Sequence, residues 1–208
     1  MLFFRSNAFK NISYIAVFLW LITGFFRLQA QYLAPVGARL NSIGDASVTV
    51  SDAFSVFSNP SSLSGLTKSS AALFVDHRYN VSGLNTVAFA YNHFVRNTRI
   101  STGTSRFGDE LLNHSRIELA FAHKIRMVSL GGGLGYHQLS VSENGVGRAV
   151  TLQFGGMVHV SPRFLYGAHV YNMLRSKVAR ESQIYHPVLM KMGFSYLPIK
   201  SMILSGEI

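Results

Sequence analysis

The stretch RIELAFAHK, residues 116–124, alternates between two kinds of side chain. Ile117, Leu119 and Phe121 would lie on one face of an extended chain, and the residues between them are small or polar. A period of two residues is typical of a β-strand with two different environments, because a helix places its apolar residues three and four positions apart. The stretch therefore predicts an all-β protein.

The same alternation recurs on both sides of this stretch. It is strong at residues 86–92, 128–137, 150–160, 164–170 and 188–196, and weaker at 69–78, 99–107 and 201–208. Together these segments predict an antiparallel sheet of about nine strands. The second face carries small residues such as Ala88, Ala120, Gly131, Gly133 and Gly155. Small side chains on this face predict that another segment of the chain packs closely against it; the alternative is that the glycines mark bends in tilted strands.

The links between the expected strands alternate between short and long. Short links are expected at 96–98, 125–126, 161–162 and 198–200, and longer ones at 79–83, 108–115, 142–148 and 173–186. Outer-membrane barrels with up-and-down strands show this asymmetry, with short turns at one end and longer loops at the other. The pattern predicts an up-and-down transmembrane β-barrel whose large apolar side chains face lipid. An exported soluble β-rich binding protein is the alternative.

The first thirty residues have the layout of a secretory signal peptide. Arg5 and Lys10 precede an uncharged apolar run at residues 12–26, and Ala30 provides a small residue at the cleavage position. An N-terminal transmembrane anchor is the alternative, although a span needs about 20 apolar residues and Arg27 ends the run. The sequence thus predicts an exported protein with a signal peptide at residues 1–30.

Composition excludes several classes of protein. The 208 residues contain no cysteine, which excludes a disulfide scaffold and a cysteine-based zinc site. The net charge is +10, but the basic residues occur singly near strand ends rather than as a stripe. This distribution predicts contact with outer-membrane lipid and lipopolysaccharide phosphates, and no nucleic-acid partner.

Catalytic and metal-binding patterns are weak. The eight histidines are scattered, with no pair spaced for one helix face and no acidic cluster nearby. We therefore expect no catalytic residue, cofactor or metal. His159 and His169 form the one candidate pair, on either side of the expected turn at 161–162. The alternative function that depends on them is a lipid-modifying barrel enzyme, in which they would form a metal pair or part of a Ser-His dyad.

Residues 31–68 contain an ordered set of short motifs. They are Gly37-Ala38-Arg39, Gly44-Asp45-Ala46, Asp52, and Asn59-Pro60 followed by Leu63. In this order they resemble the opening of PorV/PorQ-like outer-membrane proteins, which belong to the FadL-like barrels of Bacteroidetes-type bacteria. The resemblance implies a structural role for the motif residues Gly37, Ala38, Arg39, Gly44, Asp52, Asn59 and Pro60.

The resemblance also implies how the chain is organised and what it does. Residues 31–68 would be a lumen segment resembling a plug, and residues 69–208 would be the barrel strands. Nine strands are an odd number for a single-chain bacterial barrel, so we expect a chain truncated at its C-terminal end. The implied function is non-enzymatic: passage of small apolar molecules across the outer membrane, or an accessory role in protein secretion together with secretion-system components.

Overall fold

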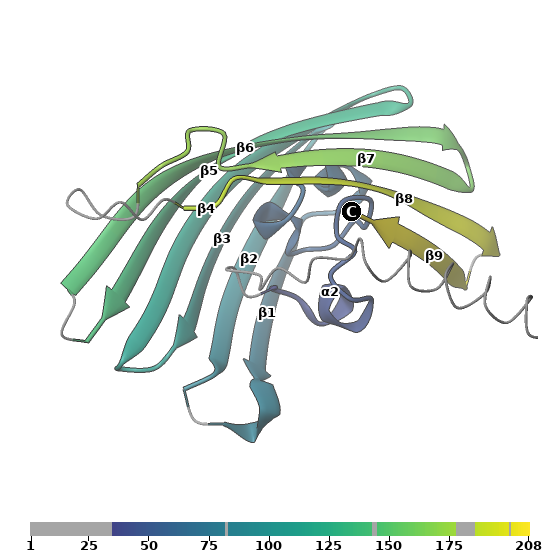
Figure 1. Ribbon diagram of the computed structural model, residues 1–208. Coiled ribbons are helices and arrows are strands. Elements are labelled where there is room, and N and C mark those ends of the chain that lie inside the picture. Colours follow the sequence, from purple (N-terminus) through teal and green to yellow (C-terminus); the bar gives the residue numbers. More distant parts are fainter. Residues whose placement is uncertain (1–34, 82, 143–144, 178–185, 200) are drawn as a thin grey trace, which may run out of the picture. The chain divides into compact units, whose positions relative to one another are not determined.

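Nine antiparallel strands form a single curved sheet in the computed structural model (Figure 1). The structure describes residues 35–81, 83–142, 145–177, 186–199 and 201–208, so the expected signal peptide lies outside the described residues. The strands are β1 (Ser70–His77), β2 (Asn85–Val95), β3 (Thr98–Gly108), β4 (Leu112–Ile125), β5 (Val128–Val141), β6 (Gly145–Ser161), β7 (Phe164–Tyr171), β8 (Leu189–Ile199) and β9 (Met202–Glu207). The prediction of an all-β chain with about nine strands is confirmed.

Each strand pairs with its neighbours in the sequence, so the order across the sheet runs from β1 to β9 without a crossover. This confirms the up-and-down arrangement. Within the part of the chain that the structure describes, β1 pairs only with β2 and β9 only with β8. The sheet is therefore open, with β1 and β9 as its two edges.

Two of the expected long links are shorter than predicted. β3 ends at Gly108 and β4 begins at Leu112, whereas a link over 108–115 was expected. Likewise β6 begins at Gly145 rather than after residue 148. The alternation of apolar residues stops before the strands do, because polar residues at these ends still form ladder pairs, such as Phe107 with His114. The link between β1 and β2 is long, as expected. β7 ends at Tyr171 and β8 begins at Leu189; of the stretch 172–188 between them, the structure describes residues 172–177 and 186–188.

The two faces of the sheet have opposite exposure. Leu119 and Phe121 are 57% and 58% exposed, while Ala120 and Ala122, which alternate with them along β4, are buried. The same contrast separates Phe89 from its buried neighbours Ala88 and Ala90 on β2. The large apolar side chains thus point away from the rest of the chain, and the small ones point toward it.

Residues 35–68, called here the N-terminal segment, cover the small-residue face. The segment contains the short helix α2 (Ala38–Ser42) and two 3-10 turns, η1 (Ser55–Phe57) and η2 (Pro60–Gly65). A third 3-10 turn, η3 (Arg78–Asn80), lies in the link between β1 and β2. Turn η2 contacts β3, β4, β5 and β6, and η1 contacts β3 and β4.

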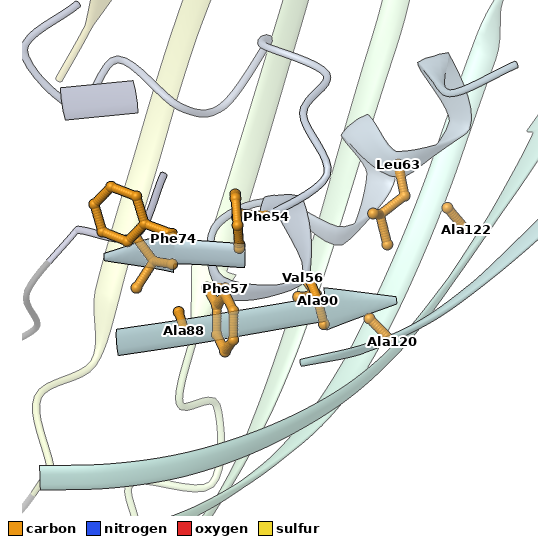
Figure 2. Packing of buried hydrophobic residues seen from close by; sticks show 10 residues of the cluster. Phe54, Val56, Phe57, Leu63, Phe74, Ala88, Ala90, Ala120 and Ala122 are labelled. Atoms are coloured by element: carbon orange, nitrogen blue, oxygen red, sulfur yellow. The ribbon is translucent and has the colours of Figure 1, made fainter. Parts of the chain in front are cut away.

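The main apolar core lies between this segment and the first strands of the sheet. Leu63, Val56 and Phe54 come from the segment and are buried. Figure 2 shows them with Phe57 and Phe74 and with the small strand residues Ala88, Ala90, Ala120 and Ala122. Complete burial of a side chain such as Leu63 stabilises a fold by about 1.5–3 kcal/mol, so these contacts hold the segment on the sheet.

Glycine makes this close approach possible at two positions. A Cβ atom at Gly131 would lie 2.6 Å from the carbonyl carbon of Pro60, and one at Gly155 would lie 2.9 Å from Cγ of Asn59. Real Cβ atoms do not approach other heavy atoms this closely, so any other residue would push η2 away from β5 and β6. The small-residue face is therefore shaped to the segment that covers it.

Candidate functional site

Buried polar side chains gather on the covered face of β4, β5 and β6. The two-residue turn after β4 sets the register so that Arg116 pairs with His137 and Glu118 with Gly135. Alternate residues of each strand then point to the covered face, which places Arg116, Glu118 and His137 side by side there. Glu118 is completely buried, and Arg116 and His137 are 4% and 2% exposed.

His137 lies at the centre of this group. Its Nδ1 atom is 3.2 Å from Nε2 of His114. His114 lies on β4, two residues before Arg116 and on the same face. The Nε2 atom of His137 is 2.8 Å from the Tyr171 hydroxyl, 3.0 Å from Thr151 Oγ1 and 3.3 Å from Glu118 Oε1. Both ring nitrogens of His137 therefore have polar partners inside the protein, as buried polar atoms need.

Gln153 on β6 connects the group to the N-terminal segment. Its amide nitrogen donates to the Val56 carbonyl at 2.9 Å and to Glu118 Oε2 at 3.2 Å. Its amide oxygen accepts a hydrogen bond of 3.0 Å from His169 Nε2. Gln153 is 1% exposed, so this network is closed off from solvent and links three strands to η1.

His186 enters the same group from the link at 172–188. Asn172, which is completely buried, donates to the His186 carbonyl at 2.7 Å and accepts from the Ser176 amide at 3.2 Å. The His186 ring centre lies 4.7 Å from that of His137, with the rings nearly perpendicular. One ring nitrogen from each of His114, His137 and His186 lies within 4.8 Å of the other two. We call these three residues the histidine cluster.

The electrostatics of the group are set by burial and by one pair of opposite charges. Arg116 donates from Nε to Ser105 at 2.8 Å, and its guanidinium lies 4.6 Å above the Phe57 ring. The Glu118 carboxylate two residues away offsets the Arg116 charge. Burial, together with the nearby His137 and Arg116, lowers the pKa of His186 to about 3. His186 is consequently a neutral imidazole at neutral pH, which is the form that binds metals.

The residues named from the sequence lie elsewhere, in the N-terminal segment. Gly37 precedes helix α2 with a φ angle of 111°, and Arg39 donates to the Ser51 carbonyl at 3.1 Å. Asp52 accepts a hydrogen bond of 2.8 Å from the Phe54 amide. Ala38 lies in the first turn of α2, and Gly44, with a φ of 67°, lies in the turn that follows it. These positions shape the loops of the segment.

Asn59 and Pro60 are the motif residues that contact the sheet. Asn59 is completely buried and donates from Nδ2 to the Val48 carbonyl at 2.6 Å. Its Oδ1 accepts from the amide and the hydroxyl of Ser61, at 3.1 and 2.8 Å, which caps η2. Pro60 occupies the first position of η2, where its missing N–H costs nothing.

The candidate pair His159 and His169 is not brought together. The register of β6 and β7 pairs His169 with Gly155. Four residues of extended strand separate Gly155 from His159, which is about 13 Å. His169 belongs to the Gln153 network, and His159 lies near the turn between β6 and β7.

The histidine cluster was missed in the sequence. The histidines were expected to be scattered without acidic partners, whereas His114, His137 and His186 gather beside Glu118. The short turn at 126–127 carries a usable signal, since it aligns Arg116 with His137 across two strands. No comparable signal exists for His186, which reaches the cluster from a long link.

The opposite face of the sheet is a second candidate site. Its exposed large apolar residues extend across β2, β4, β5, β6 and β8, and we call them the outer apolar face: Val87, Phe89, Tyr91, Ile117, Leu119, Phe121, Leu130, Leu134, Tyr136, Val150, Phe154, Met190, Met192 and Phe194. Contiguous patches of this kind mark contact with a membrane or with another protein. Among the described residues, no helix has the length and apolar character needed to span a bilayer.

Comparison with known proteins adds no relative to this description. No protein-family model, curated protein or solved structure matches the chain.

Proposed function

We propose that this chain is a non-enzymatic outer-membrane protein whose sheet forms part of the wall of a transmembrane β-barrel. The outer apolar face carries this proposal. Its central residues, such as Leu119 and Phe121, are more than half exposed, and leaving so many large apolar side chains in water would be costly. In a bilayer the same side chains are in their preferred solvent.

The covered face fits the lumen side of such a wall. Polar groups including Arg116, Glu118 and Gln153 lie there, shielded from lipid by the sheet and from the lumen by the N-terminal segment. In hydrocarbon every backbone N–H and C=O needs a partner. The edges of β1 and β9 would therefore have to pair with further strands in the membrane, which makes the sheet one part of a closed barrel.

The motif order in the N-terminal segment supports the same assignment. By its resemblance to the PorV/PorQ-like proteins, the chain would pass small apolar molecules or assist protein secretion, in contact with outer-membrane lipid, lipopolysaccharide and secretion-system components. Export through a signal peptide at residues 1–30 belongs to this proposal.

A matched pair of leucine substitutions tests the membrane assignment. Leu119 lies in the middle of β4 and is 57% exposed, and Leu111 lies in the link before β4 and is 68% exposed. In lipid, Leu119→Arg places a charge near the bilayer midplane, at a cost of about 2–4 kcal/mol. Leu111→Arg lies outside the strand and should cost little. In a soluble protein both exposed leucines tolerate arginine equally.

The readout is the amount of folded protein in the outer-membrane fraction of a Gram-negative host. The full chain should resist carbonate washing and migrate differently on gels before and after heating. We expect Leu119→Arg to lower the amount of this heat-modifiable form, and Leu111→Arg to leave it unchanged. Complete release by carbonate, or equal behaviour of the two variants, would contradict the proposal. Release by carbonate would instead favour an exported soluble β-rich protein.

A further inference from the structure

We propose that the histidine cluster binds one divalent transition-metal ion of the borderline class, for which Zn²⁺ is the reference ion. His114, His137 and His186 would supply three neutral imidazole nitrogens. Imidazole suits zinc, copper, nickel and iron, whereas magnesium and calcium prefer oxygen ligands. Three protein ligands leave a fourth tetrahedral position for water or a solute.

The distances fit a tetrahedral ion. Zinc–nitrogen bonds of about 2.0–2.1 Å at the tetrahedral angle place two ligand nitrogens roughly 3.3 Å apart. The separation between His114 Nε2 and His137 Nδ1 is 3.2 Å, with a hydrogen bond between the two nitrogens. To bind an ion at both nitrogens, the shared proton would move to the other nitrogen of its own ring. One ring nitrogen of each histidine lies within 4.8 Å of one ring nitrogen of each of the other two, so ion binding would draw the three rings closer together.

The surroundings of His137 match those of a metal ligand. A ligating imidazole usually donates its second N–H to a carboxylate or another oxygen, which holds the ring in place. When Nδ1 of His137 binds the ion, the ring proton lies on Nε2, which faces Glu118 Oε1, Thr151 Oγ1 and the Tyr171 hydroxyl at 2.8–3.3 Å. Glu118 and Thr151 are completely buried, so this support is built into the fold.

The backbone also presents the ligands on firm elements. His114 and His137 lie on the paired strands β4 and β5. His186 is held through its carbonyl by the buried Asn172. Bound metal would therefore connect the end of the link at 172–188 to the centre of the sheet.

Charge near the cluster is balanced rather than acidic. Arg116 opposes a cation, and the neighbouring Glu118 carboxyl group counteracts it. The guanidinium is directed to Ser105 and lies over the Phe57 ring. The affinity would accordingly come from the three nitrogen ligands and not from a general negative potential.

Metal titration of the full chain tests this inference independently of membrane insertion. The protein would carry a tag without histidine, be stripped with a chelator in detergent, and be titrated with Zn²⁺ by calorimetry. Co²⁺ would then report the coordination geometry through its visible absorption. We expect one ion per chain and a tetrahedral Co²⁺ spectrum. His114→Gln, at a half-buried position, should weaken Zn²⁺ binding by more than about 100-fold.

Two further variants keep the result interpretable. Glu118→Gln retains all three ligands and should weaken binding by about 10–100-fold through His137 alone. His93→Gln, at an exposed histidine of β2, is the matched control and should leave stoichiometry and affinity unchanged. Circular dichroism would confirm the strand content of each variant. Absence of binding to the parent chain, an octahedral Co²⁺ spectrum, or equal losses in His114→Gln and His93→Gln would overturn the proposal.

Discussion

Replacement of Gly155 by alanine should destabilise the packing of the N-terminal segment against the sheet. Gly155 lies on the covered face of β6, directly beneath Asn59. The new Cβ atom would lie 2.9 Å from Asn59 Cγ and closer still to Asn59 Oδ1. Asn59 cannot move aside easily, because it is completely buried and its side chain forms hydrogen bonds with Val48 and Ser61.

The magnitude follows from these contacts. Overpacking of a well-filled interior costs about 1–3 kcal/mol, so the free energy of unfolding should fall by that amount. Gly156, the next residue, faces the other side of the sheet and meets only Leu130 at 3.7 Å, an ordinary contact. Gly156→Ala should therefore be neutral, or stabilising by about 0.5–1 kcal/mol, because alanine loses less backbone entropy than glycine.

Urea unfolding in lipid or detergent, followed by circular dichroism, measures both variants. With a slope of about 2 kcal/mol per molar urea, Gly155→Ala should lower the midpoint by about 1 M. The double variant Asn59→Ala, Gly155→Ala adds a direct test of the contact. Removing the Asn59 side chain frees space for the new methyl group. The double variant should therefore lose less unfolding free energy than the sum of the two single variants, by about 0.5–3 kcal/mol.

Equal midpoints for Gly155→Ala and Gly156→Ala would refute close packing of the N-terminal segment against Gly155. Strict additivity in the double variant would show that Asn59 does not lie over Gly155.

Two further predictions concern the charged and titrating groups of the covered face. Lys191→Met should lower the free energy of unfolding by about 1–3 kcal/mol. The Lys191 ammonium lies 3.3 Å from the Asp45 carboxylate and 3.0 Å from the Glu207 carboxylate, and its loss leaves both without this partner. Lys191→Arg is the control, and an unchanged urea midpoint for Lys191→Met would contradict the prediction. Lowering the pH should destabilise the metal-free protein, since burial lowers the pKa of His186 to about 3 while the unfolded chain takes up a proton near pH 6.5. Between these values the contribution of His186 to the free energy of unfolding should fall by about 1.4 kcal/mol per pH unit. His186→Gln should therefore flatten the pH dependence by that amount, and an unchanged slope would contradict this prediction.

The strands were predictable because each has two faces in different surroundings. Large apolar residues such as Leu119 and small ones such as Ala120 alternate wherever one face is covered and the other is not. The same contrast indicated that something packs against the small residues. Which atoms meet was not predictable: the contact between Asn59 and Gly155 depends on the path of the N-terminal segment, and no periodic pattern encodes that path.

Strand ends and the histidine cluster show where sequence patterns stop being informative. Backbone pairing continues through Asn113 and His114 although alternation has ceased, because ladder hydrogen bonds do not depend on side-chain polarity. The turn at 126–127 could have placed Arg116 beside His137. His186 joins them from outside the strands, where its position depends on tertiary contacts such as the hydrogen bond that Asn172 donates to its carbonyl.

The most direct test of the membrane assignment is the solvent that surrounds the outer apolar face. The chain has no cysteine, so single-cysteine variants can carry a nitroxide at chosen positions. Leu119 and Leu134 pair with each other on β4 and β5, and Leu111 lies outside the strands. In lipid vesicles, labels at positions 119 and 134 should collide with oxygen more than with a water-soluble nickel chelate, and the label at 111 should do the reverse. Equal access of the nickel chelate to all three positions would contradict a sheet that faces lipid.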